Sequence, residues 1–165
     1  MIQYLYASLI TLLTVLLMLG LTFNVGRARG KYQVAAPAIS GHELFERAYR
    51  IQLNTIENVL MFLPALWLYA IFIGDKGAGD SGVIWLIARV WYSIAYQQNP
   101  AKRGLGFLIS ILVIAGLWTG AAYGIFLQYM KLWWNLLQNA AVALVSALSI
   151  MWVIVGVVKF GAVKK

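Results

Sequence analysis

The chain has 165 residues, of which 62% are hydrophobic and only 11% are charged, and its formal net charge is +8. Soluble domains usually carry about 25% charged residues, so this chain has too few charges to coat a water-facing surface. The composition predicts an integral membrane protein. The basic residues lie beside apolar segments, which is typical of membrane topology and argues against nucleic-acid binding.

The scarce residue types restrict the chemistry. The chain has no cysteine and a single histidine, His42. Disulfides, zinc–thiolate sites and protein thiol nucleophiles are therefore excluded, as is a histidine-rich metal site. A single histidine also argues against a serine–histidine–aspartate triad. Any reaction must use Arg, Tyr, Asn, Gln and Glu side chains, or a group that the substrate brings.

The first apolar segment covers about residues 2–25, and a helix needs about 20 such residues to cross a bilayer. It is too long for a signal-peptide core and lacks a basic leader, so we interpret it as a true span. Further apolar segments follow at about residues 45–73, 83–97, 105–129 and 136–158, separated in part by a Gly/Asp-rich turn at 75–82 and a helix break at Pro100.

These segments predict an all-α integral membrane protein. A four-helix transmembrane bundle is expected in residues 1–130, and a fifth C-terminal transmembrane helix with a basic tail in residues 131–165. With five spans, ten basic residues lie on one face of the membrane, which predicts a cytoplasmic C-terminus. These ten are Arg27, Arg29, Lys31, Arg47, Arg50, Lys102, Arg103, Lys159, Lys164 and Lys165, whereas only Lys76 and Lys131 lie on the other face.

A polar stripe marks the start of the second helix. Arg50, Asn54 and Glu57 are spaced at i, i+4 and i+7 and share one helical face. Polar and ionisable groups at membrane depth indicate a functional site by default. The alternative is internal pairing of Arg50 with Glu57 or with Glu46, and the spacing alone leaves both interpretations open.

A second stripe lies on the third helix. Arg89, Tyr92 and Tyr96 share one face, and Arg103 follows at the start of the next helix. The alternatives are an interfacial aromatic belt for the tyrosines and a plain topological charge for Arg103, and for Arg89 we favour a structural ion pair. Together the two stripes offer guanidinium, amide, phenol and carboxylate groups, which suit a small zwitterionic molecule with several carboxylates.

The fourth segment carries Gly116, Gly120 and Gly124, each four residues apart. Small residues at this spacing allow close contact between membrane helices. Glycine is also generally common in membrane helices, so the spacing leaves both interpretations open.

Three stretches resemble one family. They are Ala28-Arg29-Gly30-Lys31-Tyr32, the run from Phe45 to Glu57 with its Arg50, Gln52 and Asn54, and the run from Arg89 to Pro100-Ala101-Lys102-Arg103. They are similar to the MAPEG family, the membrane-associated proteins of eicosanoid and glutathione metabolism, over about residues 5–128. Within it the chain resembles bacterial members and the branch that holds microsomal glutathione transferases of types two and three and cysteinyl-leukotriene synthase.

The resemblance implies a homotrimer of four-helix subunits that binds glutathione, as cosubstrate and without a metal, between neighbouring subunits. The implied reaction is attack of the glutathione thiolate on a lipophilic electrophile or lipid hydroperoxide, at the cytoplasmic side of a bacterial inner membrane. By matching position, Arg103 would hold the thiolate, and Arg29, Arg50, Gln52, Asn54, Glu57, Tyr92 and Tyr96 would bind glutathione.

The chain departs from the family pattern at three positions. Gly30 replaces a second arginine of the leukotriene synthase, which argues against leukotriene synthesis. Asn58 replaces an aromatic residue that contacts glutathione, and Leu60 replaces a proline, while Pro64 lies one turn later and would displace any kink.

Two other functions stay open from the sequence. A non-enzymatic lipid-binding scaffold of the same fold is disfavoured by the intact Arg103 and the complete Arg50–Asn54–Glu57 stripe. A small exporter or channel subunit is disfavoured because few charges lie in the middle of any predicted span.

Overall fold

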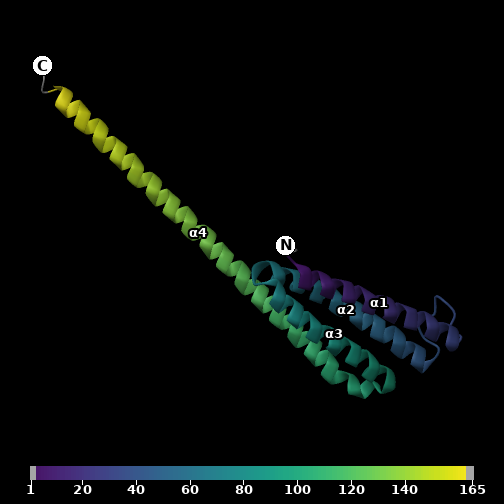
Figure 1. The fold of residues 1–165 in the computed structure, drawn as a ribbon. Helices are drawn as coiled ribbons and strands as arrows, with labels where there is room; N and C mark the ends of the chain where they lie inside the picture. Colours follow the sequence, from purple (N-terminus) through teal and green to yellow (C-terminus); the bar gives the residue numbers. More distant parts are fainter. Residues whose placement is uncertain (1–2, 163–165) are drawn as a thin grey trace. The chain divides into compact units, whose positions relative to one another are not determined.

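The computed structural model describes the backbone of residues 3–162 and the side chains of residues 3–152. Its described residues form helices and no strand, and the chain divides into two compact units, Met1–Gly124 and Ile125–Lys165. In the first unit, α1, α2, α3 and the start of α4 lie side by side (Figure 1). The all-α prediction is confirmed. The elements are α1 (Leu5–Lys31), α2 (Glu43–Phe72), α3 (Asp75–Gln98), the short 3₁₀ helix η1 (Pro100–Arg103) and α4 (Gly104–Ala162).

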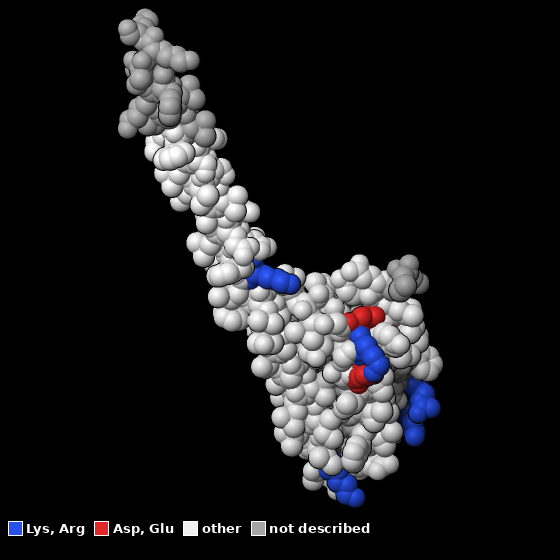
Figure 2. Space-filling view, turned by 60° about the vertical axis from the view of Figure 1, so that its left-hand side comes forward, with Lys and Arg blue, Asp and Glu red and all other residues white. Residues whose placement is uncertain are grey.

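Three stretches are long and apolar enough to cross a membrane: α1, α2 and the stretch Pro100–Trp152. Figure 2 shows one face of the molecule, on which charged residues form a few small groups on a mostly uncharged surface. Many large apolar side chains are exposed, among them Leu12, Leu16 and Leu60, each more than half accessible. Such a surface needs lipid as its solvent, and the chain is a multi-pass integral membrane protein.

Helix α3 begins earlier than the sequence predicted. Residues 75–82, expected as a turn because of their glycines, form its first two turns. Gly79 and Gly82 lie against α1 so closely that an added Cβ would stand 2.6 Å from Tyr6 Cβ and 2.6 Å from Ile10 Cγ2. These glycines therefore allow α3 to pack closely against α1, and this contact stabilises a helix where the local sequence alone predicted a turn.

The start of α3 also caps α1. Both carboxylate oxygens of Asp75 accept hydrogen bonds from α1, at 2.9 Å from the backbone nitrogens of Tyr6 and Ala7. The first N–H groups of a helix have no intrahelical partner, so this carboxylate satisfies two of them and complements the helix dipole.

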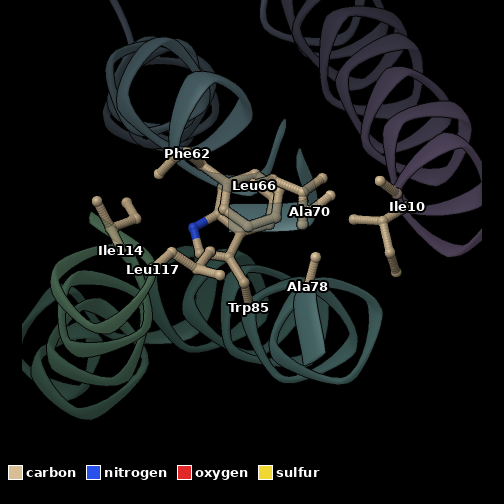
Figure 3. Packing of buried hydrophobic residues seen from close by; sticks show 10 residues of the cluster. Ile10, Phe62, Leu66, Ala70, Ala78, Trp85, Ile114 and Leu117 are labelled. Carbon is tan, nitrogen blue, oxygen red and sulfur yellow. The ribbon is translucent and has the colours of Figure 1, made fainter. Parts of the chain in front are cut away.

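The core of the first unit joins α1, α2, α3 and α4. The rings of Phe62 and Trp85 stack at 3.9 Å between centroids, with Leu66 and Leu117 packed around them (Figure 3). Pro64 lies between the core residues Phe62 and Leu66, and α2 continues through it without a break.

The glycine stripe of α4 partly serves close packing. Gly120 lies against the ring of Tyr69, and an added Cβ on Gly124 would stand 2.9 Å from Phe72 Cβ. Gly116 has nothing within 4 Å of that position. Two of the three glycines therefore allow a close α2–α4 contact, and the third does not.

The expected break before a separate fifth helix is absent from the described residues. Residues 136–158 continue α4, which runs unbroken over 59 residues. Residues 130–138 contain neither glycine nor proline, so the helix has no local reason to end there. The five-span topology stays a prediction.

Candidate functional site

A cavity of about 540 Å³ lies between α2, α3, η1 and the start of α4, entirely within the first unit. It brings together five of the eight residues predicted from the sequence, from positions as far apart as 50 and 103. Its lining consists of Arg50, Asn54, Tyr92, Tyr96, Arg103, Gly104 and Phe107.

The α2 wall of the cavity carries Arg50 and Asn54, one helical turn apart. The internal pairing considered for Arg50 does not occur in the described part of the chain, where the ion pairs are Glu43–Arg47 and Lys76–Asp80. Glu46 instead accepts a hydrogen bond from the backbone nitrogen of Gly41 at 3.0 Å. The exposed guanidinium group of Arg50 is therefore available to an anionic ligand.

The α3 wall carries Tyr92 and Tyr96, whose ring centroids lie 5.7 Å apart. Tyr92 is almost fully buried, with 1% of its surface exposed. The buried guanidinium of Arg89 lies 4.1 Å from the centroid of the Tyr92 ring, in the geometry of a cation–π contact. This contact fixes the ring of Tyr92 at the back of the cavity.

The ion pair favoured for Arg89 from the sequence is wrong. Arg89 Nη2 donates to Thr55 Oγ1 at 2.8 Å, and within residues 3–152 its Nε and Nη1 have no hydrogen-bond partner. Thr55 lies on the buried face of α2, and its own hydroxyl donates to the backbone oxygen of Ile51 at 2.8 Å. The helical spacing in the sequence did not identify it as a partner of Arg89. Arg89 therefore connects α2 to Tyr92.

Arg103 is the last residue of η1 and closes the third side of the cavity. Its guanidinium carbon lies 5.0 Å from the centroid of the Tyr96 ring. Asn99 starts η1 by accepting a hydrogen bond from the backbone nitrogen of Ala101 at 2.9 Å. This side-chain cap, followed by Pro100, is the local reason why the chain turns here and presents Arg103 beside α3.

The end of α3 is tied to the start of α2. Arg47 donates to the backbone oxygens of Gln97 and Gln98 at 3.1 and 3.2 Å, and it also pairs with Glu43. Gln97 Nε2 donates to the backbone oxygen of Leu44 at 3.2 Å. A cation at a helix C-terminus satisfies the free carbonyl groups and stabilises the helix dipole. Arg47, which the sequence suggested only as a topological charge, thus holds the turn that carries Arg103.

Three predicted site residues do not line this cavity. Arg29 donates to the backbone oxygens of Val34 and Ala38 at 3.1 and 2.8 Å and lies over the ring of Phe45. Gln52 faces α1, where its Nε2 donates to Thr22 Oγ1 at 2.7 Å. Glu57 lies on the face of α2 that carries Arg50, two turns further along, and is exposed.

Phe107 and Gly104 line the cavity but were not predicted from the sequence. Phe107 lies one turn after Arg103, so the i,i+4 rule applied to Arg103 would have found it. Asn58, which replaces a family aromatic, is buried, with its Oδ1 unpaired in the described residues and its Nδ2 3.3 Å from the backbone oxygen of Asn54.

The apolar helices and the polar cavity lined by α2, α3, η1 and α4 define the class: an all-α, multi-pass integral membrane protein with a polar site. Residues 7–123 match the model of the MAPEG family, and the chain belongs to that family. Both predictions, of the fold class and of the family, are confirmed.

Several curated proteins are similar to the chain. An uncharacterized protein from the cyanobacterium Synechocystis is 43% identical over 130 residues, which cover 79% of this chain and 95% of the relative. Microsomal glutathione S-transferase 2 from Bos taurus is 34% identical over 65% of this chain and 73% of its own length. Leukotriene C4 synthase from Bos taurus is 36% identical over 57% of this chain and 63% of its own length.

Proposed function

We propose that the protein is a membrane-bound glutathione transferase, with glutathione peroxidase activity as a second use of the same site. Glutathione carries two carboxylates, one ammonium group and a thiol. The cavity offers two guanidinium groups, which suit a carboxylate and the thiolate, and an amide and two phenols, which can form further hydrogen bonds. The observation that carries the proposal is the meeting of Arg50 and Arg103 with Tyr92 and Tyr96 in one cavity, in a chain with a glutathione S-transferase among its relatives.

In the proposed mechanism Arg103 stabilises the glutathione thiolate. A free thiol has a pKa of about 8.5, and a cation about 4 Å away contributes on the order of 4 kcal/mol at an effective dielectric constant of 20. Even half of this energy lowers the thiol pKa by more than one unit. Tyr96, whose ring lies next to the Arg103 guanidinium, would donate a hydrogen bond to the sulfur.

The thiolate then attacks an electrophile that enters from the lipid. With an epoxide, a carbon–sulfur bond forms, the carbon–oxygen bond breaks and the alkoxide takes up a proton. With a lipid hydroperoxide, sulfur attacks the outer oxygen, the O–O bond breaks and a lipid alcohol leaves. A second glutathione then reduces the sulfenic acid to give glutathione disulfide and water. The protein needs no cysteine, because the cosubstrate supplies the nucleophile.

We further propose a homotrimer in which neighbouring subunits complete each site. Arg29 and Gln52 lie on the α1 side of the subunit, away from the cavity of their own chain. They would therefore reach glutathione in the site of an adjacent subunit. Glu57 would bind the ammonium group from the same face as Arg50.

The proposed location is the inner membrane of a bacterium, with the site facing the cytoplasm. The relative from Synechocystis supports a bacterial origin. Arg50, Lys102 and Arg103 surround or flank the cavity, and basic residues mark the cytoplasmic side.

The test is turnover by the purified protein in detergent. We expect conjugation of glutathione to at least one lipophilic epoxide or unsaturated carbonyl compound, or reduction of a lipid hydroperoxide, well above the uncatalysed rate. S-methylglutathione, which lacks the thiol proton, is the matched control and should support no reaction. Tight glutathione binding without turnover across a broad panel would instead support the lipid-binding scaffold.

A further inference from the structure

The C-terminal unit carries a polar stripe that the proposed function does not use. Between Ile125 and Trp152, every Lys, Asn, Gln and Ser residue falls on one side of α4. At 100° per residue they occupy an arc of about 100°. This part of the chain lies outside the family match, which ends at residue 123. The stripe consists of Gln128, Lys131, Asn135, Gln138, Asn139, Ser146 and Ser149.

The rest of the helix surface is apolar. Trp134, Leu137 and Leu144 are 62%, 60% and 65% exposed in the chain. An amphipathic helix of a soluble protein has a narrow apolar stripe and a broad polar face, whereas here the proportions are reversed. The broad apolar face therefore belongs in lipid, and the narrow polar face requires protein or water.

Within the described part of the second unit, the four amides of the stripe lack hydrogen-bond partners. Gln128, Asn135, Gln138 and Asn139 are exposed and make no hydrogen bond there. The two serines are satisfied locally, because Ser146 and Ser149 bond to the backbone oxygens of Val142 and Val145. An amide without a partner is unfavourable in hydrocarbon, so these four amides need a second surface that offers both donors and acceptors.

We propose that residues 125–152 lie in the membrane, as the five-span topology predicts, and that their polar face is a contact between copies of this chain. An amide side chain both donates and accepts hydrogen bonds, so identical amide stripes are self-complementary. Gln128, Lys131, Asn135 and Gln138 are spaced alternately three and four residues apart, which is the spacing of a helix–helix seam. Asn, Gln and Ser side chains also join membrane helices by hydrogen bonds across their contacts.

Lys131 fits the same arrangement. It lies near the start of the stripe, and its long apolar stem allows the ammonium group to reach the membrane surface while the amides further along stay in contact. This contact does not depend on glutathione chemistry. Its failure would leave the proposed function untouched.

The absence of cysteine makes site-directed cross-linking a direct test. Single cysteines are introduced in the full-length protein as Val142→Cys, which lies within the stripe, and as Leu144→Cys, which lies on the opposite face. Both replace an exposed aliphatic residue, two positions apart. After oxidation in native membranes, we expect disulfide-linked dimers at least about fivefold more abundant for Val142→Cys. Ser146→Cys and Leu148→Cys form a second matched pair.

The role of the amides is tested in the Val142→Cys background. Changing Asn135, Gln138 and Asn139 together to leucine should reduce cross-linking several-fold, whereas Leu137→Ala with Leu148→Ala on the other face should not. Equal cross-linking at both faces, or none at either, would overturn the proposal. So would fast labelling of Val142→Cys by a membrane-impermeant maleimide from either side of the membrane, because the stripe would then face water.

Discussion

Replacing Arg103 by alanine is expected to lower the turnover of glutathione conjugation by about 30-fold, which corresponds to losing about 2 kcal/mol of thiolate stabilisation. The guanidinium lies beside Tyr96 at the edge of the cavity, where a sulfur atom can reach it. Without this cation the charged form of the thiol is less favourable, and the pKa of bound glutathione rises. At neutral pH the bound glutathione of this variant is therefore protonated to a larger extent than in the wild type, and its thiolate forms only at higher pH.

This prediction is checked by the ultraviolet absorbance of the bound thiolate and by the pH profile of turnover. Arg103→Lys should restore activity only in part, because an ammonium group lacks the guanidinium fork. Lys102→Ala removes the same charge from the neighbouring exposed position, outside the cavity lining, and is the matched control. An unchanged thiolate signal and normal turnover in Arg103→Ala would make Arg103 a topological charge, and Tyr92 or Tyr96 the next candidate.

Replacing Gly106 by valine is expected to destabilise the first unit by about 1–3 kcal/mol and to abolish the cavity. A Cβ at this position would stand 2.8 Å from the backbone nitrogen of Tyr92 and 2.9 Å from the backbone oxygen of Ala88. These are backbone atoms, so no side-chain rotation relieves the clash. Helix α4 must move away from α3 at the level where Tyr92 and Arg103 meet.

Thermal unfolding in detergent and glutathione affinity both report on this change. The matched control is Gly116→Val on the same helix, because an added Cβ there meets nothing within 4 Å. We expect Gly116→Val to keep the wild-type midpoint and affinity, and Gly106→Val to lose both. If the two variants behave alike, the close α3–α4 contact does not build the cavity.

Five of the residues that line the cavity could be predicted from local sequence patterns. Helical spacing placed Arg50 with Asn54, and Tyr92 with Tyr96, on single faces, and the cap at Asn99 with Pro100 set the turn before Arg103. These signals act over three to eight residues, so they are readable in a sequence. The structure unites all of these faces in one cavity.

The contacts that hold the site were not readable in this way. Arg89 donates a hydrogen bond to Thr55, which lies 34 positions away in the sequence. Arg47 donates to the backbone carbonyl of Gln97 at the end of α3, which lies 50 positions away. The helical state of Gly79 and Gly82 likewise depends on α1 lying against them. Such pairings are set by how the helices pack, which local spacing does not encode.

The most direct test of the central claim is calorimetric titration of glutathione into the purified protein and its Arg50→Ala variant, with Lys102→Ala as the charge-matched control. A lost charged hydrogen bond contributes about 1.5–3 kcal/mol, so we expect Arg50→Ala to weaken binding by roughly 10- to 150-fold and Lys102→Ala to leave it unchanged. Wild-type affinity in a correctly folded Arg50→Ala, or equal losses in both variants, would show that this cavity is not the glutathione site.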